Sequence, residues 1–169
     1  MGRSKIKYPT TPATRFLKKH RIEYTSHLYD YELSEGSSVA QAAANALGIE
    51  QHEMVKTIVL VDHLERPLIV LMHGDCTINT GELARQLSCK KITPCRPEQA
   101  QRISGYQVGG TSPFGTRKEM PVYMEQTILD LEYIYINAGK RGYLIKMTPQ
   151  DVVDALHVNM VQVAVFRDS

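Results

Sequence analysis

The sequence predicts a mixed α/β fold in which helices surround a barrel-like, curled β-sheet. Three observations lead to this fold class. Apolar runs rich in β-branched residues occur in pairs around polar turns, as in hairpins, and helical segments fall between them at irregular intervals. The length of 169 residues, with 43% hydrophobic and 22% charged residues, suits one hydrophobic core. We therefore expect a single domain over residues 1–169, with residues 1–10 as a loosely ordered N-terminal tail.

Capping residues mark the expected helices. A serine, threonine or asparagine side chain can accept a hydrogen bond from the first turn, proline suits the first helical position, and glycine often follows the last turn. Five segments carry such signals: residues 11–20 with Thr11 and Pro12, residues 37–48 with Ser37 or Ser38 and Gly48, residues 79–88 with Asn79 or Thr80, residues 96–105 with Pro97 and Gly105, and residues 148–157 with Thr148 and Pro149.

Alternating or continuous apolar residues mark the expected strands. The strands cover residues 22–32, the two apolar runs of residues 54–74, and residues 89–95, 121–125, 131–139, 140–147 and 160–166. Tyr29 and Tyr31 should share one face of the first strand, because alternate strand residues point to the same side. A turn with Gly139 and Gly142 should join the strands over 131–139 and 140–147.

Composition excludes several classes of protein. No stretch approaches the roughly 18 apolar residues of a membrane span, and the first residues lack the apolar run of a secretory signal, so we expect a cytoplasmic protein without a membrane partner. Cys76, Cys89 and Cys95 form no C-x-x-C pair and have no histidine at zinc-finger spacing. We expect free thiols, no metal and no cofactor.

The charge pattern leaves the partner open. A net charge of +2 is too small to identify a nucleic-acid-binding protein. Basic clusters at residues 18–21, 90–91, 117–118 and 140–141 would attract phosphate if the fold gathers them. They are equally consistent with an ordinary solvated surface.

Residues 105–118 hold four of the chain's 11 glycines in a polar segment. Such a density serves either a turn or a close approach of main-chain N–H groups to a ligand. Residues 110–115 have the spacing of a phosphate loop, but Thr116 and Arg117 stand where lysine and serine or threonine are required, and G-x-G-x-x-G is absent. A bound nucleoside triphosphate or dinucleotide is therefore not implied.

Lys56 is the most unusual charged residue, because it lies within an apolar strand on the face of Met54, Ile58 and Leu60. One interpretation is a packed stem with the ammonium reaching water. The other is a lysine at the rim of a pocket, where it would bind phosphate or stabilise negative charge that develops at an ester. His73 and Cys76 offer an alternative chemistry as base and nucleophile.

Four segments in this order and spacing, TPATRFLKKHRIEYTSHLYDY, VKTIVLV, GYQVGGTSPFG and IYINAGKRG, resemble the YbaK family of aminoacyl-tRNA deacylases, relatives of the prolyl-tRNA synthetase editing domain. The likeness covers about residues 11–160. It implies a mixed α/β fold around a barrel-like sheet. It also implies hydrolysis of the ester between a wrong amino acid and the tRNA 3′ end, typically in Cys-tRNA(Pro), with aminoacyl-tRNA as partner and prolyl-tRNA synthetase as a candidate partner.

The resemblance also implies site residues. Lys56 matches the family's functional lysine, Gly109 the glycine that helps to form the aminoacyl pocket, and Tyr29 a tyrosine of the first strand. Glycines at 109 and 110 would let backbone amides approach the substrate carbonyl and the 3′-terminal ribose. The expected site comprises Lys56 and Gly109 as catalytic residues and Tyr29, Gly110, Thr111, Ser112, Pro113, Asn137, Ala138 and Gly139 as substrate-binding residues.

The sequence departs from the family at residues 137–139, where Asn-Ala-Gly replaces the Ser-Gly-Gly that is common in Cys-tRNA(Pro) deacylases. Some relatives that clear alanine or serine from tRNA carry Asn-Ala-Gly. Because the glycine segment is of the cysteine type, we predict Cys-tRNA(Pro) as the preferred substrate. An Ala- or Ser-tRNA deacylase and a non-catalytic tRNA-binding or regulatory module are the alternatives. The mechanism implied by the resemblance uses the substrate's own thiol or a positioned water, and no protein nucleophile.

Overall fold

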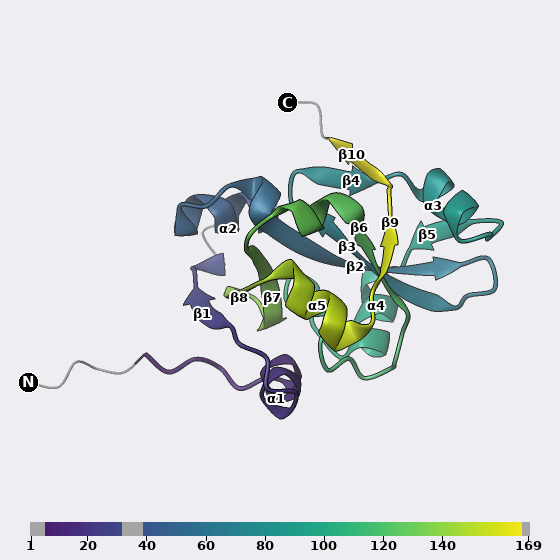
Figure 1. The fold of residues 1–169 in the computed structure, drawn as a ribbon. Coiled ribbons are helices and arrows are strands. Elements are labelled where there is room, and N and C mark those ends of the chain that lie inside the picture. The colour runs from purple at the N-terminus through teal and green to yellow at the C-terminus, as the bar shows by residue number, and fades with distance from the viewer. Residues whose placement is uncertain (1–5, 32–38, 167–169) are drawn as a thin grey trace, which may run out of the picture.

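The computed structural model describes residues 6–31 and 39–166 (Figure 1). Residues 6–10 contain neither helix nor strand. The remainder of the expected tail, residues 1–5, and the expected caps Ser37 and Ser38 lie outside the described residues.

A mixed sheet of eight strands forms the centre of the fold, in the order β1-β8-β7-β2-β3-β6-β9, with β5 paired to β2. β4 and β10 form a separate two-stranded sheet. β2 pairs with β3 and β5 in antiparallel fashion and with β7 in parallel fashion. The strands are β1 (Thr25–Leu28), β2 (Met54–Asp62), β3 (Pro67–His73), β4 (Cys76–Ile78), β5 (Ile92–Pro94), β6 (Val122–Glu125), β7 (Ile134–Lys140), β8 (Tyr143–Met147), β9 (Asn159–Val161) and β10 (Ala164–Phe166).

Helices cover both faces of the sheet. The helices are α1 (Pro12–Lys19), α2 (Val39–Leu47), α3 (Thr80–Gln86), α4 (Pro97–Ser104) and α5 (Pro149–Leu156), with short 3₁₀ helices η2 (Gln51–Glu53) and η3 (Gln126–Asp130). α1, α4 and α5 pack on the face that carries Val55 and Val59, whereas α3 packs on the face of Leu60. α2 covers the same side as α3 at Met54. In Figure 1, α2 and α3 lie at opposite ends of the sheet, with β4 and β10 along the edge between them.

Most of the expected caps are present. The Thr11 hydroxyl accepts from the Thr14 N–H at 3.1 Å and the Thr14 hydroxyl accepts from the Thr11 N–H at 2.9 Å, which forms a reciprocal capping box. Asn79 and Thr148 cap α3 and α5 through their side-chain oxygens. Gly105 follows α4 with φ +81°, a conformation that costs glycine little.

The mixed α/β class is confirmed, but the barrel-like curvature is not. The sheet runs from β1 at one end to β9 at the other, and no pairing joins these two strands among the described residues. The sheet is therefore open.

The first strand is shorter than expected. β1 ends at Leu28, which pairs with Tyr143, the first residue of β8, so the chain beyond Leu28 has no strand residue left to pair with. Tyr29 and Tyr31 consequently lie after the strand and not on one of its faces. The Tyr29 N–H instead donates to the carbonyl of Gly142 at 2.9 Å.

The strand expected over residues 160–166 is two strands in different sheets, and β4, the partner of β10, was not predicted from the sequence. The chain changes sheets at Val163. The N–H groups of Val163 and Ala164 both donate to the buried Glu125 carboxylate, at 2.7 and 2.8 Å, in place of strand pairing.

None of the helices in the described part of the chain combines the length and apolarity that a membrane crossing requires.

Candidate functional site

One edge of β2 has a gap in its strand pairing. β7 pairs with this edge at Met54 and Val55, and β5 pairs with it from Leu60 to Asp62. Between these two strands, the Cys95 N–H donates to the Val59 carbonyl at 3.0 Å. Residues 56–58 have no strand opposite them on this edge in the part of the chain that the structure describes.

A cavity of about 400 Å³ opens at this gap. Its walls come from both sides of the sheet and from the glycine segment. The lining residues are Tyr29, Ala40, Met54, Val55, Lys56, Thr57, Ile58, Val59, Gly74, Pro94, Cys95, Pro97, Ala100, Val108, Gly109, Thr111, Asn137 and Leu144. The cavity is mostly apolar with a few polar groups, as is typical of ligand sites.

Lys56 lies at this cavity and is partly buried. Its ammonium donates a hydrogen bond to the main-chain carbonyl of Cys76, the first residue of β4. That contact gives the Nζ atom a defined position on the face of β2 that also carries Met54. Lys56 is therefore placed where its charge could act on a ligand in the cavity.

The glycine segment is held in place by the turn between β7 and β8. The Asn137 amide Nδ2 donates to the Gly109 carbonyl at 3.1 Å, while its Oδ1 accepts from the N–H groups of Gly139 and Lys140 at 2.8 and 3.2 Å. The Arg141 Nε donates to the Val108 carbonyl at 2.7 Å. Asn137 thus uses both ends of its amide to position Gly109.

The two adjacent glycines serve different purposes. Gly109 lines the cavity and has φ +90°. Residues other than glycine rarely adopt this backbone conformation. Gly110 does not line the cavity, and a Cβ atom there would stand 2.8 Å from the Arg141 backbone nitrogen. The close approach at Gly110 is therefore to the protein's own chain.

The structure brings five of the ten predicted site residues to the cavity and leaves five away from its lining. The lining residues are Tyr29, Lys56, Gly109, Thr111 and Asn137; the others are Gly110, Ser112, Pro113, Ala138 and Gly139.

The five residues away from the lining support the loop and the strand behind it. Ser112 is fully buried and its hydroxyl accepts from the Phe114 N–H at 3.3 Å, which stabilises the turn. Ala138 is also fully buried, and its carbonyl accepts from the Thr11 hydroxyl. A Cβ atom at Gly139 would stand 2.6 Å from the Tyr106 ring. A direct contact of these five residues with a substrate stays a prediction from the sequence.

Two buried hydroxyls at the cavity have no hydrogen-bond partner. They belong to Tyr29 and Thr57, and within residues 6–31 and 39–166 they are the only buried side-chain polar atoms without one. Burial is the main cause that raises the pKa of Tyr29, and the electrostatic effect of the nearby Tyr31 adds to it. The Tyr29 hydroxyl therefore stays protonated. Thr57 was not predicted from the sequence, although a lone hydroxyl within the apolar run MVKTIVLVD was the available signal.

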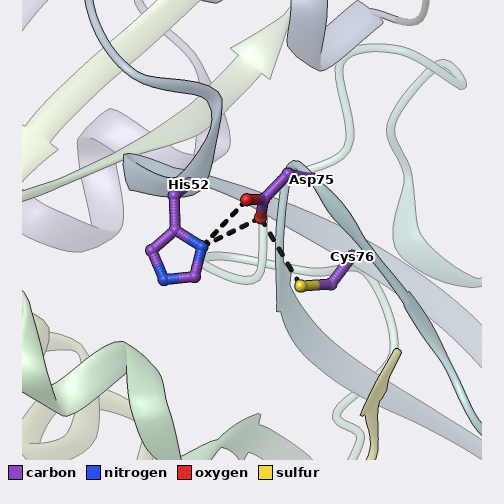
Figure 2. A group of neighbouring side chains, drawn as sticks. All are labelled: His52, Asp75 and Cys76. Atoms are coloured by element: carbon purple, nitrogen blue, oxygen red, sulfur yellow. Dashed lines mark hydrogen bonds and ion pairs between the residues drawn. The ribbon is translucent and has the colours of Figure 1, made fainter. Parts of the chain in front are cut away.

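His52, Asp75 and Cys76 form a compact cluster (Figure 2), in which the nitrogen, oxygen and sulfur atoms that could bind a metal lie within 4.8 Å of one another. Lys56 is next to it, through its hydrogen bond to the Cys76 carbonyl. The His52 Nδ1 lies 2.9 and 3.1 Å from the two Asp75 oxygens, and the Cys76 thiol donates to Asp75 at 3.5 Å. Burial acts to raise the pKa of Asp75, but the bonds from His52 and Cys76 outweigh it and the pKa is lowered. The three groups thus satisfy one another within the cluster.

The Cys76 thiol and the His73 imidazole, which the sequence offered as a nucleophile and its base, both make contacts with other groups. Burial, together with the Asp75 carboxylate, raises the pKa of Cys76 to about 12, so the reactive thiolate is scarce at neutral pH. The two ring nitrogens of His73 contact the His52 carbonyl and the Thr127 hydroxyl, each at 2.8 Å. This geometry does not support His73 and Cys76 as base and nucleophile.

A cysteine-free variant with Cys76→Ala, Cys89→Ser and Cys95→Ser should keep its turnover within a factor of a few, because the Cys76 carbonyl that holds Lys56 is a main-chain group. Alanine suits position 76 because the thiol is fully buried. Ester hydrolysis by this variant, and by the wild type after treatment with a chelator, checks the expectation of no protein thiol and no metal. A folded protein that loses turnover in either arm would refute it.

Comparison with known proteins identifies the family. The model of the aminoacyl-tRNA editing domain matches residues 34–155. The "Putative Cys-tRNA(Pro)/Cys-tRNA(Cys) deacylase EbsC" of Enterococcus faecalis is 29% identical over 143 residues, which are 85% of this chain and 86% of the relative. A proline–tRNA ligase of Limosilactobacillus fermentum is 24% identical over 112 residues, 64% of this chain but only 20% of the ligase.

A solved structure shows the same fold. The crystal structure of "a putative trans-editing enzyme for prolyl tRNA synthetase" superposes with a TM-score of 0.78 at 20% identity, and the match covers 93% of this chain and 99% of that one. The family model alone spans well over half of the chain. The protein therefore belongs to the aminoacyl-tRNA editing domain family.

Proposed function

We propose that this chain hydrolyses the ester bond of mischarged aminoacyl-tRNA, with Cys-tRNA(Pro) as the preferred substrate. The observation that carries the proposal is the cavity at the gap in β2. It combines one lysine ammonium, the main chain at Gly109 and two buried hydroxyls without partners among the described residues. This set can bind a small aminoacyl group and stabilise charge at its carbonyl.

In the proposed reaction, a nucleophile attacks the carbonyl carbon of the ester and negative charge develops on the carbonyl oxygen. The Lys56 ammonium stabilises this charge. The bond between the carbonyl carbon and the 3′-terminal ribose oxygen then breaks, and the ribose oxygen takes up a proton. The nucleophile is a water or the thiol of a cysteinyl substrate. Attack by the thiol leaves a thioester that water opens in a second step.

The tRNA is the proposed partner of a domain that comprises residues 1–169, and prolyl-tRNA synthetase is a candidate partner. Lys140 and Arg141 are exposed and lie directly behind Gly110. Their position beside the cavity suits contacts to phosphates near the tRNA 3′ end, which lysine and arginine side chains make. The likeness to a segment of proline–tRNA ligases supports a role in proline decoding.

A deacylation panel tests the proposal. We expect Cys-tRNA(Pro) to be hydrolysed fastest, Ser- and Ala-tRNA(Pro) more slowly, and Pro-tRNA(Pro) to be spared. Size discrimination of one small group amounts to only about 1–3 kcal/mol, so the ranking is the informative result. Faster clearance of Ala-tRNA than of Cys-tRNA at equal concentration would make the chain an alanine-type deacylase. Binding of tRNA without hydrolysis of any ester would make it a non-catalytic module.

A further inference from the structure

We propose that Thr57 determines side-chain specificity at this site, by hydrogen bonding to the hydroxyl or thiol of a small aminoacyl group. The inference rests on the proposed function and names the substrate class more closely: esters of serine and cysteine are favoured over the ester of alanine. It stands on the position of Thr57 in β2, on its unpartnered hydroxyl and on the character of the surrounding wall.

Thr57 lies in the middle of the gap in β2. The Gly74 N–H donates to the Met54 carbonyl and the Asp62 N–H to the Arg66 carbonyl, so even-numbered residues of β2 direct their main-chain groups toward β3. Antiparallel pairs alternate between hydrogen-bonded and non-hydrogen-bonded. The pair of Thr57 with Leu71 is therefore not hydrogen-bonded. The N–H and C=O of Thr57 point away from β3, toward the edge of β2 on which β7 and β5 leave residues 56–58 without a strand among the described residues.

The Thr57 hydroxyl adds a third polar group at this position. It is buried and has no hydrogen-bond partner within residues 6–31 and 39–166. A buried hydroxyl without a partner destabilises a protein, so each such group in a native structure calls for an explanation. A ligand that supplies the missing partner is the explanation that also accounts for its place on the cavity wall.

The wall on this side of the sheet is apolar. Thr57 shares it with Val59, Cys95, Pro97 and Ala100. A methyl group placed there, as in an alanyl ester, leaves the hydroxyl unpaired, whereas a hydroxyl or thiol pairs with it. A site whose buried polar group must be paired discriminates strongly against ligands that lack the partner.

The second unpartnered hydroxyl is placed differently. Tyr29 packs with Ala40, Met54 and Leu144 on the opposite face of the sheet, the face of Lys56. We assign it to a part of the substrate that all aminoacyl esters share. Tyr29→Phe should therefore lower the rates for different amino acids by a common factor.

The test compares Thr57→Val with the matched control Thr57→Ser. Valine replaces the hydroxyl with a methyl group of similar shape, and serine keeps the hydroxyl. For Thr57→Val we expect kcat/KM to fall about tenfold or more with Ser-tRNA, which is about 1.4 kcal/mol, and less with Cys-tRNA, because sulfur forms weaker hydrogen bonds. The rate with Ala-tRNA should change less than threefold. Thr57→Ser should keep the wild-type ranking.

Thermal unfolding adds a readout that a purely structural role would not produce. Thr57→Val removes an unpaired buried hydroxyl, so its Tm should equal or exceed that of the wild type. A fall in Tm together with equal losses for all substrates would show that Thr57 has only a structural role.

A binding measurement separates this inference from the proposed hydrolysis. Non-hydrolysable 3′-seryl-amino- and 3′-alanyl-amino-deoxyadenosine are titrated into wild type and Thr57→Val by calorimetry. The wild type should prefer the seryl compound, and the variant should lose that preference, whether or not esters are cleaved. Equal binding of both compounds by the wild type, or an unchanged preference in Thr57→Val, would overturn the inference. The wild-type deacylation panel alone decides the proposed function.

Discussion

Lys56→Ala should lower the deacylation rate by about 10²–10³-fold, the usual effect of removing one group that stabilises charge in the transition state. The fold should survive. Lys56 is only partly buried, so its replacement removes little packing. The hydrogen bond that its ammonium donates to Cys76 is made to a main-chain carbonyl. Single-turnover hydrolysis of Cys-tRNA(Pro), with circular dichroism and thermal unfolding on the same samples, measures both quantities.

Three further variants sharpen this result. Lys56→Met keeps the aliphatic stem without the charge and should be as inactive as Lys56→Ala. Lys56→Arg should also be impaired, because a planar guanidinium does not reproduce a compact ammonium. Lys90→Ala removes an exposed lysine that does not line the cavity and should behave as the wild type. A folded Lys56→Met with full activity would remove Lys56 from the mechanism.

Gly109→Ala should reduce turnover by about 10–100-fold and lower stability by about 1–3 kcal/mol, the usual cost of a non-glycine residue in an unfavourable backbone conformation. The new Cβ atom would lie 2.5 Å from the Tyr31 hydroxyl and 3.2 Å from the Arg141 Nε. Because Arg141 holds the Val108 carbonyl, relief of this clash displaces the loop that closes the cavity. Turnover per folded molecule and urea unfolding separate the two effects.

Gly48→Ala is the matched control for backbone strain. Gly48 has φ +66°, but a Cβ atom added there would have no neighbour within 4 Å, and the residue does not line the cavity. It should show a similar loss of stability with normal turnover. If Gly109→Ala also kept normal turnover per folded molecule, Gly109 would be a turn residue only.

The features predicted well from the sequence depend on neighbouring residues. The hairpin of β2 and β3 follows from two apolar runs around a polar turn, and the caps at Thr11, Asn79 and Thr148 act within three residues along the chain. The position of Lys56 among apolar strand residues also follows from local alternation. Such local signals can be interpreted without knowledge of what packs against them.

The features that were missed depend on contacts between distant segments. The gap in β2 arises because β7 and β5 pair with different parts of one edge, and no local pattern shows where a partner strand stops. The packing of Gly110 against residues 140–141 was not predicted, and its contact with a substrate stays a prediction. Asn137 lines the cavity, but its hydrogen bond to Gly109, 28 positions earlier in the chain, was not predicted.

The first helix has a consequence for how the protein loses its activity. The Thr11 hydroxyl is bonded to the Ala138 carbonyl, and the carbonyl of Pro12 lies so close to Gly115 that a Cβ atom there would stand 2.5 Å from it. The start of α1 is thus wedged between β7 and the end of the glycine segment. Proteolytic removal of α1 would take away a support of both the glycine segment and β7, the strand that carries Asn137, so inactivation should accompany the first cut in this helix and precede global unfolding.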